Sequence, residues 1–173
     1  GMKAWLYDED RFPSGSAGGM VVQDNPVYGA KALEMLEIPH SQIDEIDSKL
    51  KIFLPRRSGE NISYEDITNI PKEDVVKENT LVLVFRIVFM DKLGRCNNKP
   101  YTDLCYKDAV DRFIEITHEK YKKDLKEHFG NTIPGIFTDE PNFNVNTAGK
   151  NYLPWTYQFE EYFRDKKGYC IID

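Results

Sequence analysis

Two adjacent acids, Asp139 and Glu140, follow a short apolar stretch and precede a proline. A buried strand accounts for Ile136 and Phe137, but ionised carboxylates are rarely taken out of water without a partner. In α/β folds, catalytic side chains collect at the carboxyl ends of core strands. Because a residue before proline is biased toward an extended backbone, Pro141 restricts where the Glu140 side chain points. The pair is therefore a candidate catalytic centre, with a solvated exit from the strand as the alternative.

A second acidic segment has the same layout. The apolar stretch Lys3–Tyr7 is followed by three acids and a base, Asp8, Glu9, Asp10 and Arg11. These side chains would either orient a substrate or form a local salt-bridged loop. Residues 12–19 are rich in small side chains, which let a backbone approach a ligand closely. Their spacing matches neither G-x-G-x-x-G nor the P-loop, so the sequence does not favour phosphate binding.

Carboxylates that flank a sugar carry out glycoside hydrolysis, in which one protonates the leaving oxygen and another acts as nucleophile or base. Adjacent side chains on a strand point to opposite faces, so Asp139 and Glu140 would not act on the same atom. We predict Glu140 as the general acid, and Asp139 either as a hydrogen-bonding group for the substrate or as a support for the residues that contact it. Tyr7 would help Asp8–Arg11 to orient the sugar. Trp155 would stack on a sugar ring or pack its own helix.

The elements that position these groups follow an α/β pattern with a parallel sheet. Asp103 lies near the end of one predicted strand and would bring a third carboxylate to the same edge. The predicted strands of the main fold are Lys3–Tyr7, Tyr101–Cys105 and Ile133–Thr138. The predicted helices run from Asn25 to Pro39, from about Lys107 to Phe129, and from Trp155 to Lys167.

Residues 43–100, between the first predicted helix and the second predicted strand, have a different sequence pattern from the rest of the chain. Lys49–Pro55 and Leu81–Met90 are typical of strands, and polar, turn-rich segments separate them. We interpret residues 43–100 as a small antiparallel β insertion and residues 1–173 as a single domain.

The composition excludes several function classes. A net charge of −6 argues against nucleic acid or an anionic membrane as a partner. The longest apolar run, Leu81–Met90, is too short to span a membrane, and no signal peptide precedes it. The three cysteines are odd in number and lack metal-ligand spacing, so we expect incidental thiols. No cofactor is predicted. A divalent cation such as calcium would suit the clustered acids, but no EF-hand spacing supports one.

Several motifs resemble large bacterial glycoside hydrolases of the α-L-rhamnosidase type. The resemblance covers most of the chain outside the β insertion and rests on Trp5–Gly15 with Ala17–Gly19, Phe113–Tyr121, Gly135–Pro141, and Leu153–Thr156 with Gly168–Tyr169. It implies a (β/α)₈ TIM barrel, of which the three predicted strands would be the second, third and fourth. Glu140 would then sit like the acid/base glutamate at the end of the fourth strand. Asp139 stands where an asparagine usually precedes that glutamate.

We therefore expect a partial (β/α)₈ barrel that acts on an oligo- or polysaccharide. The alternative is a non-catalytic carbohydrate-binding or structural remnant of such a barrel. Three open parallel strands leave unpaired edges, so the chain would self-associate through them. The second catalytic carboxylate would lie outside the chain, and the parent enzyme would be periplasmic or exported.

Overall fold

The computed structural model describes residues 1–75, 79–143 and 152–172. They form two compact units. Unit 1 comprises the described residues within Gly1–Lys31, Phe89–Asn146 and Thr156–Gln158. Unit 2 comprises those within Ala32–Val88, Thr147–Trp155 and Phe159–Asp173. No helix in the described segments is long and apolar enough to cross a membrane.

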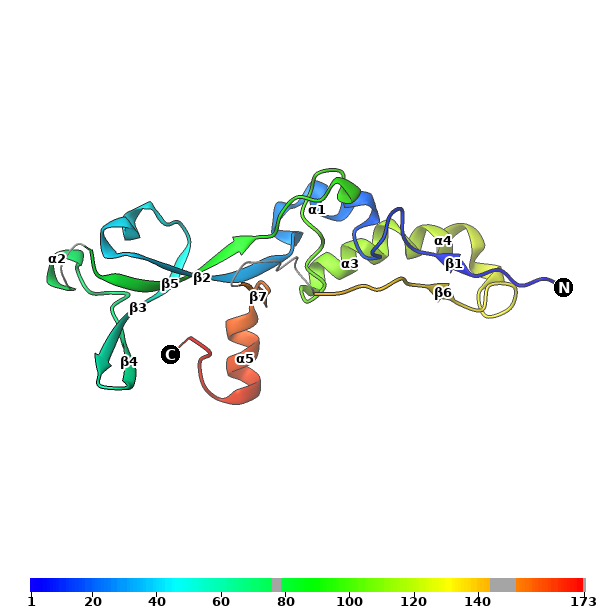
Figure 1. The fold of residues 1–173 in the computed structure, drawn as a ribbon. Helices are drawn as coiled ribbons and strands as arrows, with labels where there is room; N and C mark the ends of the chain where they lie inside the picture. The colour runs from blue at the N-terminus through cyan, green and yellow to red at the C-terminus, as the bar shows by residue number, and fades with distance from the viewer. Residues whose placement is uncertain (76–78, 144–151, 173) are drawn as a thin grey trace. The chain divides into compact units, whose positions relative to one another are not determined.

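Unit 2 is built on a five-stranded sheet with the order β4-β3-β5-β2-β7 (Figure 1). Its strands are β2 (Lys31–Pro39), β3 (Lys49–Ser58), β4 (Asn61–Asp66), β5 (Leu81–Phe89) and β7 (Tyr152–Trp155). Strand β3 is antiparallel to both β4 and β5. One face of the sheet buries an apolar cluster formed by Ile43, Ile52, Leu54, Ile67, Val82 and Val84. This cluster is the core of unit 2.

Short helical segments complete unit 2. They are the 3₁₀ helix η3 (His40–Glu45), helix α2 (Lys72–Val75) and helix α5 (Phe159–Lys167). Along α5 a chain of ring contacts runs from Trp155 to Phe159 at 4.9 Å, to Phe163 at 6.0 Å and to Tyr169 at 5.2 Å between centroids. Packing of these rings accounts for the aromatic content of this segment.

One charged pair in unit 2 gives stability that depends on pH. The Lys51 ammonium lies 2.6 Å from the Asp66 carboxylate, and this bond, with two from Thr68, lowers the pKa of Asp66 to about 2. The ordinary value is near 4, so the contribution is fully present above pH 4 and is lost as the pH falls through about 2. Because the Asp66 side chain is 41% exposed, screening limits the contribution to about 1 kcal/mol or less.

We expect Asp66→Asn to lower the free energy of unfolding of unit 2 at pH 6 by that amount, and to have little effect well below pH 2, where Asp66 is protonated. Urea unfolding followed by Trp155 fluorescence measures the difference. Asp165→Asn is the control, since Asp165 is exposed on α5 and has no ion pair among the residues described. A loss of equal size at both pH values would contradict the assigned pKa.

Unit 1 contains a parallel pair of short strands, β1 (Leu6–Tyr7) and β6 (Ile136–Phe137). Backbone hydrogen bonds extend the pair, from the Ala4 N–H to the Thr132 carbonyl at 2.9 Å and from the Asp8 N–H to the Phe137 carbonyl at 3.3 Å. The two strands lie side by side in Figure 1. Their carboxyl ends therefore meet at one edge.

The rest of unit 1 consists of short helices joined by turns and loops. Its α-helices are α1 (Met20–Asp24), α3 (Lys107–Ile116) and α4 (His118–Leu125). Its 3₁₀ helices are η1 (Ala17–Gly19), η2 (Pro26–Tyr28), η4 (Gly94–Cys96) and η5 (Lys126–His128). Helix α3 packs on α1 through a core formed by Ala17, Val21, Ala109, Phe113 and Ile116.

The prediction of a partial (β/α)₈ TIM barrel is wrong. Strand β1 pairs directly with β6, so no strand lies between them. The stretch predicted as the intervening strand, Tyr101–Cys105, makes only an isolated antiparallel bridge between Thr102 and Gly29. Most of the sheet structure is instead the five-stranded sheet, and alternating βα units are lacking in the residues described. The predicted order of strands and helices failed because pairing between distant segments overrode local pattern.

The predicted helix from Asn25 to Pro39 is also wrong. Only the 3₁₀ turn η2 follows Asn25, whose side chain caps this turn by accepting a hydrogen bond from the Val27 N–H at 3.1 Å. The residues beyond form strand β2, which lies between β5 and β7. Glu34 of β2 and Arg86 of β5 form an ion pair of 2.6 Å. This cross-strand pairing selects the strand over the helix.

The long helix predicted for Lys107–Phe129 is broken at Thr117, between α3 and α4. The Thr117 hydroxyl donates to the Phe113 carbonyl at 2.6 Å, and its backbone has φ −118° and ψ −77°. A threonine that bonds back to the preceding turn bends a helix. The last predicted helix begins at Phe159, not at Trp155, because Trp155 belongs to β7.

Candidate functional site

The two acidic segments come together where β1 and β6 end. The Tyr7 hydroxyl lies 2.8 Å from the Asp139 carboxylate and in close hydrogen-bond contact with the Glu9 carboxylate. A phenol has one proton, so Tyr7 donates to only one of these carboxylates at a time. The hydrogen bond to Glu9 is the largest cause that raises the pKa of Tyr7, and the Asp139 carboxylate acts in the same direction. Tyr7 therefore stays a neutral donor across the physiological range.

Ser14, which is fully buried, fastens the small-residue loop to the end of β6. Its backbone N–H donates to the Asp139 carbonyl at 3.0 Å, and its hydroxyl accepts from the Asp139 N–H at 2.9 Å. The same hydroxyl lies 3.4 Å from the Glu9 carboxylate. The Tyr101 hydroxyl donates to the Ser14 carbonyl, and burial raises the pKa of this phenol. Ser14 thus fixes Glu9 and Asp139 relative to each other.

Asp8 is buried at the same edge, with its side chain 1% exposed. Its Oδ2 accepts a hydrogen bond from the Thr138 hydroxyl at 2.8 Å and lies 3.0 Å from His118 Nε2 on α4. Its Oδ1 has no hydrogen-bond partner. Asp8 therefore joins β1, β6 and α4, and its second oxygen is buried without a partner.

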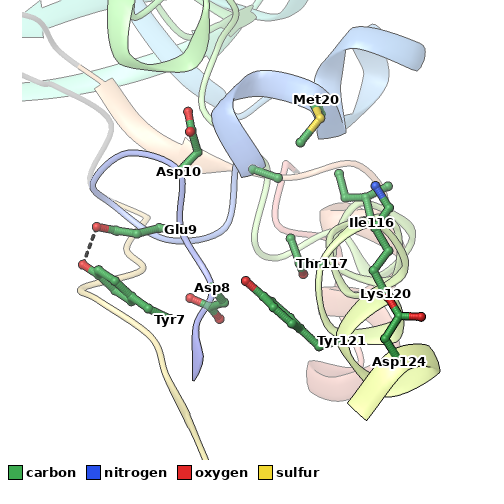
Figure 2. Close-up of a pocket in the computed structure, with 11 residues that line it drawn as sticks. Tyr7, Asp8, Glu9, Asp10, Met20, Ile116, Thr117, Lys120, Tyr121 and Asp124 are labelled. Atoms are coloured by element: carbon green, nitrogen blue, oxygen red, sulfur yellow. Dashed lines mark hydrogen bonds between the residues drawn. The ribbon is translucent and has the colours of Figure 1, made fainter. Parts of the chain in front are cut away.

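Beside these residues lies a cavity of about 430 Å³, within the range of small-molecule sites. Figure 2 shows Tyr7, Asp8 and Glu9 on one side of the cavity, and Thr117, Lys120 and Asp124 on the helical side. Its other lining residues are Asp10, Ala17, Met20, Ile116 and Tyr121. Helix α4 thus supplies a wall that the sequence did not predict.

Glu140 is exposed, and its backbone has a φ of +39°. The expectation of an extended backbone before Pro141 is therefore wrong. The Asn142 side-chain amide donates to the Glu140 carbonyl at 2.9 Å, which helps to hold this turn. A left-handed backbone costs about 1–2 kcal/mol outside glycine, and such residues concentrate at functional sites. The Glu140 side chain does not line the cavity.

The other predicted site residues have different surroundings. Asp10 is exposed and lines the cavity. Arg11 is also exposed, and its guanidinium lies 3.9 Å from the Asp10 carboxylate. This contact corresponds to the salt-bridged alternative for Asp10 and Arg11. Trp155 belongs to unit 2, where it packs against Phe159 at 4.9 Å between ring centroids. This contact corresponds to the packing alternative for Trp155.

Asp103 is buried away from the acidic edge. It lies 3.6 Å from the ammonium of buried Lys31 and accepts from the Thr156 hydroxyl at 2.8 Å. Burial lowers the pKa of Lys31, while the Asp103 carboxylate acts in the opposite direction. The Lys31 ammonium also donates to the carbonyls of Val27 and Gly29. These contacts satisfy both charges, so Asp103 is a structural group.

Within residues 1–75, 79–143 and 152–172, no three His, Cys, Asp or Glu side chains are grouped to hold a metal ion. The three cysteines are free thiols. The polar groups of the candidate site are therefore its carboxylates together with the hydroxyl groups of Tyr7 and Ser14.

Sequence reasoning missed His118, Thr138 and Ser14. The His118 side chain is only 24% exposed and contacts Asp8. No spacing in the sequence marks this pair, because the residues lie 110 positions apart. No protein-family model, curated protein or solved structure matches the chain.

Proposed function

We propose that this chain carries part of the active site of a glycoside hydrolase, with Glu140 as the proton donor. The observation that carries the proposal is the hydrogen bond between Tyr7 and Asp139, which joins the ends of two acidic segments 132 positions apart. A structural role alone does not require acids at both strand ends, because carboxylates brought together repel one another. Paired carboxylates are what glycoside hydrolysis uses. The resemblance to α-L-rhamnosidase-type enzymes favours the same chemistry.

Hydrolysis requires a proton for the leaving oxygen and a carboxylate that activates water or attacks the sugar. We assign the first role to Glu140, whose side chain is open to solvent. Its left-handed backbone supports this role, since strain of this kind is kept at functional sites. Asp139 and Glu9 would accept hydrogen bonds from sugar hydroxyl groups, because Tyr7 donates to only one of them at a time.

A second candidate function is carbohydrate binding without hydrolysis. Next to the acids, three aromatic side chains are partly exposed, Trp5 at 66%, Tyr7 at 44% and Phe137 at 52%. Tyr7 and Phe137 are paired in the β1–β6 register, with ring centroids 5.2 Å apart. Partly exposed aromatic rings offer a surface on which sugar rings stack.

The test compares the chain with Glu140→Gln on a panel of aryl glycosides that includes the α-L-rhamnoside. If self-association supplies the second carboxylate, we expect turnover by the parent chain and a loss of about 100-fold or more in the variant, since a positioned general acid contributes about 10²–10⁴. Glu119→Gln is the control, because Glu119 lies on α4 and pairs with Lys122 outside the cavity. Circular dichroism checks that all three proteins fold.

Three other outcomes decide between the candidates. Equal turnover by the parent chain and Glu140→Gln would remove Glu140 from the mechanism. Saturable binding of oligosaccharides without turnover would favour the second candidate. Neither turnover nor binding would overturn both.

A further inference from the structure

The face of the β1–β6 pair that points away from helix α4 is aromatic. Side chains alternate along an extended segment, so Trp5 and Tyr7 lie on one face and Asp8 on the other. Asp8 contacts His118, which places α4 on the side of Asp8. Phe137 faces the same way as Tyr7, because the two residues are paired in the register and their rings are in contact. We call Trp5, Tyr7 and Phe137 the aromatic face.

The rings of the aromatic face are partly exposed but held in place. The Trp5 ring lies over Gly135 so closely that an added Cβ there would come within 2.6 Å of it. The Tyr7 hydroxyl is held by its contacts with Glu9 and Asp139. Side chains that are already fixed lose little conformational entropy when a partner covers them. An exposed apolar surface of this kind is typical of an interaction site.

Opposite charges stand at the two ends of the aromatic face. Lys3 is exposed and precedes Trp5 by two positions, so it lies on the same face at the amino end. The backbone pairing of the two segments already begins at Ala4, which supports this alternation. Glu9 and Asp139 lie at the carboxyl end, where the two acidic segments meet. Among the residues described, none of these three charged side chains has an ion pair.

This arrangement of charge is complementary to a second copy of itself. A two-fold axis through the middle of the aromatic face sets the strands of the two copies antiparallel, so each basic end meets the acidic end of the other copy. We propose that two copies of this chain dock through the aromatic face, with Lys3 of each copy beside Glu9 and Asp139 of the other. The second copy thus adds a cation to the candidate site.

The size of the aromatic face sets the strength of this dimer. A covered aromatic side chain buries 150–250 Å², so three half-exposed rings supply only about 300 Å² per copy. A stable interface buries about 800 Å² on each partner. We therefore expect a weak dimer, with a dissociation constant above about 1 μM, whose charge pairs make it sensitive to salt.

Sedimentation velocity with the full chain, over a concentration series from the micromolar to the millimolar range, measures the association. We expect monomers at the low end and dimers at the high end, with a midpoint that rises as salt is added. Lys3→Glu should weaken the dimer about 10-fold or more, because it replaces two attractions per dimer by two repulsions. Lys92→Glu is the matched control and should keep the dimer, because Lys92 is exposed in the loop after β5, outside the aromatic face.

A mixture of two variants tests the charge pairing itself. Asp139→Lys alone should also weaken self-association, but its mixture with Lys3→Glu should recover mixed dimers, because opposite charges then meet at both ends. Mixing would not repair a loss of folding, which circular dichroism of each variant checks separately. A mixture that stays monomeric would overturn the proposed pairing of Lys3 with the acidic end.

Two further results would overturn this inference. Parent chains that stay monomeric throughout the series would leave the aromatic face to a different partner. Self-association that Lys3→Glu leaves unchanged would mean that another surface joins the copies.

Sedimentation tests the dimer whether or not the chain hydrolyses a glycoside. Dimers without turnover would support this interface and argue against the proposed catalysis. Turnover by chains that remain monomeric would overturn the dimer alone. A sugar stacked on the aromatic face would compete with the second copy, because both cover the same rings.

Discussion

Gly19→Ala is expected to destabilise unit 1 by about 2–5 kcal/mol, the sum of a left-handed backbone and an overlap with fixed atoms. Gly19 has a φ of +87°, which side-chain-bearing residues rarely adopt. A Cβ added there would lie 2.2 Å from the carbonyl oxygen of Cys96 and 2.8 Å from its carbonyl carbon. Both are backbone atoms, so relief requires η1 and η4 to separate. The Asn97 amide, which donates to the Gly18 carbonyl at 2.5 Å, would move with η4.

The measurement is urea unfolding of unit 1, followed by the fluorescence of Trp5 in a Trp155→Phe background. Trp5 packs against Gly135, so its fluorescence reports on the β1–β6 pair. Gly130→Ala is the matched control: Gly130 has a φ of +77°, but an added Cβ would meet no atom within 4 Å. It should cost only about 1–2 kcal/mol. Similar losses of stability in Gly19→Ala and Gly130→Ala would show that Gly19 does not lie close to the Cys96 backbone.

The placement of acids at the ends of two strands could be predicted from local sequence. Apolar residues of Lys3–Tyr7 and Ile133–Thr138 are each followed by acids, and these stretches contain β1 and β6. The local sequence of a strand does not show which other strands will pair with it. The direct pairing of β1 with β6, and the five-stranded sheet, depend on contacts between segments far apart in the chain. Local pattern cannot report these contacts.

Strand β2 illustrates a different limit. The sequence of Lys31–Pro39 contains apolar residues at spacings that suit either one helix face or alternate positions of a strand. The structure pairs it within the sheet, where Leu36 and Ile38 pack on the core. His118 shows the same limit at the site, because its contact with Asp8 depends on where α4 lies. The helix breaks at Thr117, just before α4. Predicting this break would have required knowing that the Thr117 side chain forms a hydrogen bond.

Leu54→Ala is the second large expected effect, a loss of about 3 kcal/mol from the stability of unit 2. Leu54 is 1% exposed on β3 and lies in the apolar cluster with Ile52 and Val84. Removing a buried leucine loses the transfer free energy of its side chain and leaves a cavity, which together cost about 2–5 kcal/mol. The sheet limits collapse around the cavity, because β3 is hydrogen-bonded on both sides, to β4 and to β5.

Urea unfolding of unit 2, followed by Trp155 fluorescence in a Trp5→Phe background, measures this loss. Leu81→Ala makes the same chemical change on β5 at a position that is 48% exposed. It should cost less than about 1 kcal/mol, since an exposed side chain buries little area and leaves no cavity. Equal losses from the two variants would mean that Leu54 is not at the centre of a packed core. A loss confined to Leu54→Ala would establish this face of the sheet as the element on which the stability of unit 2 rests.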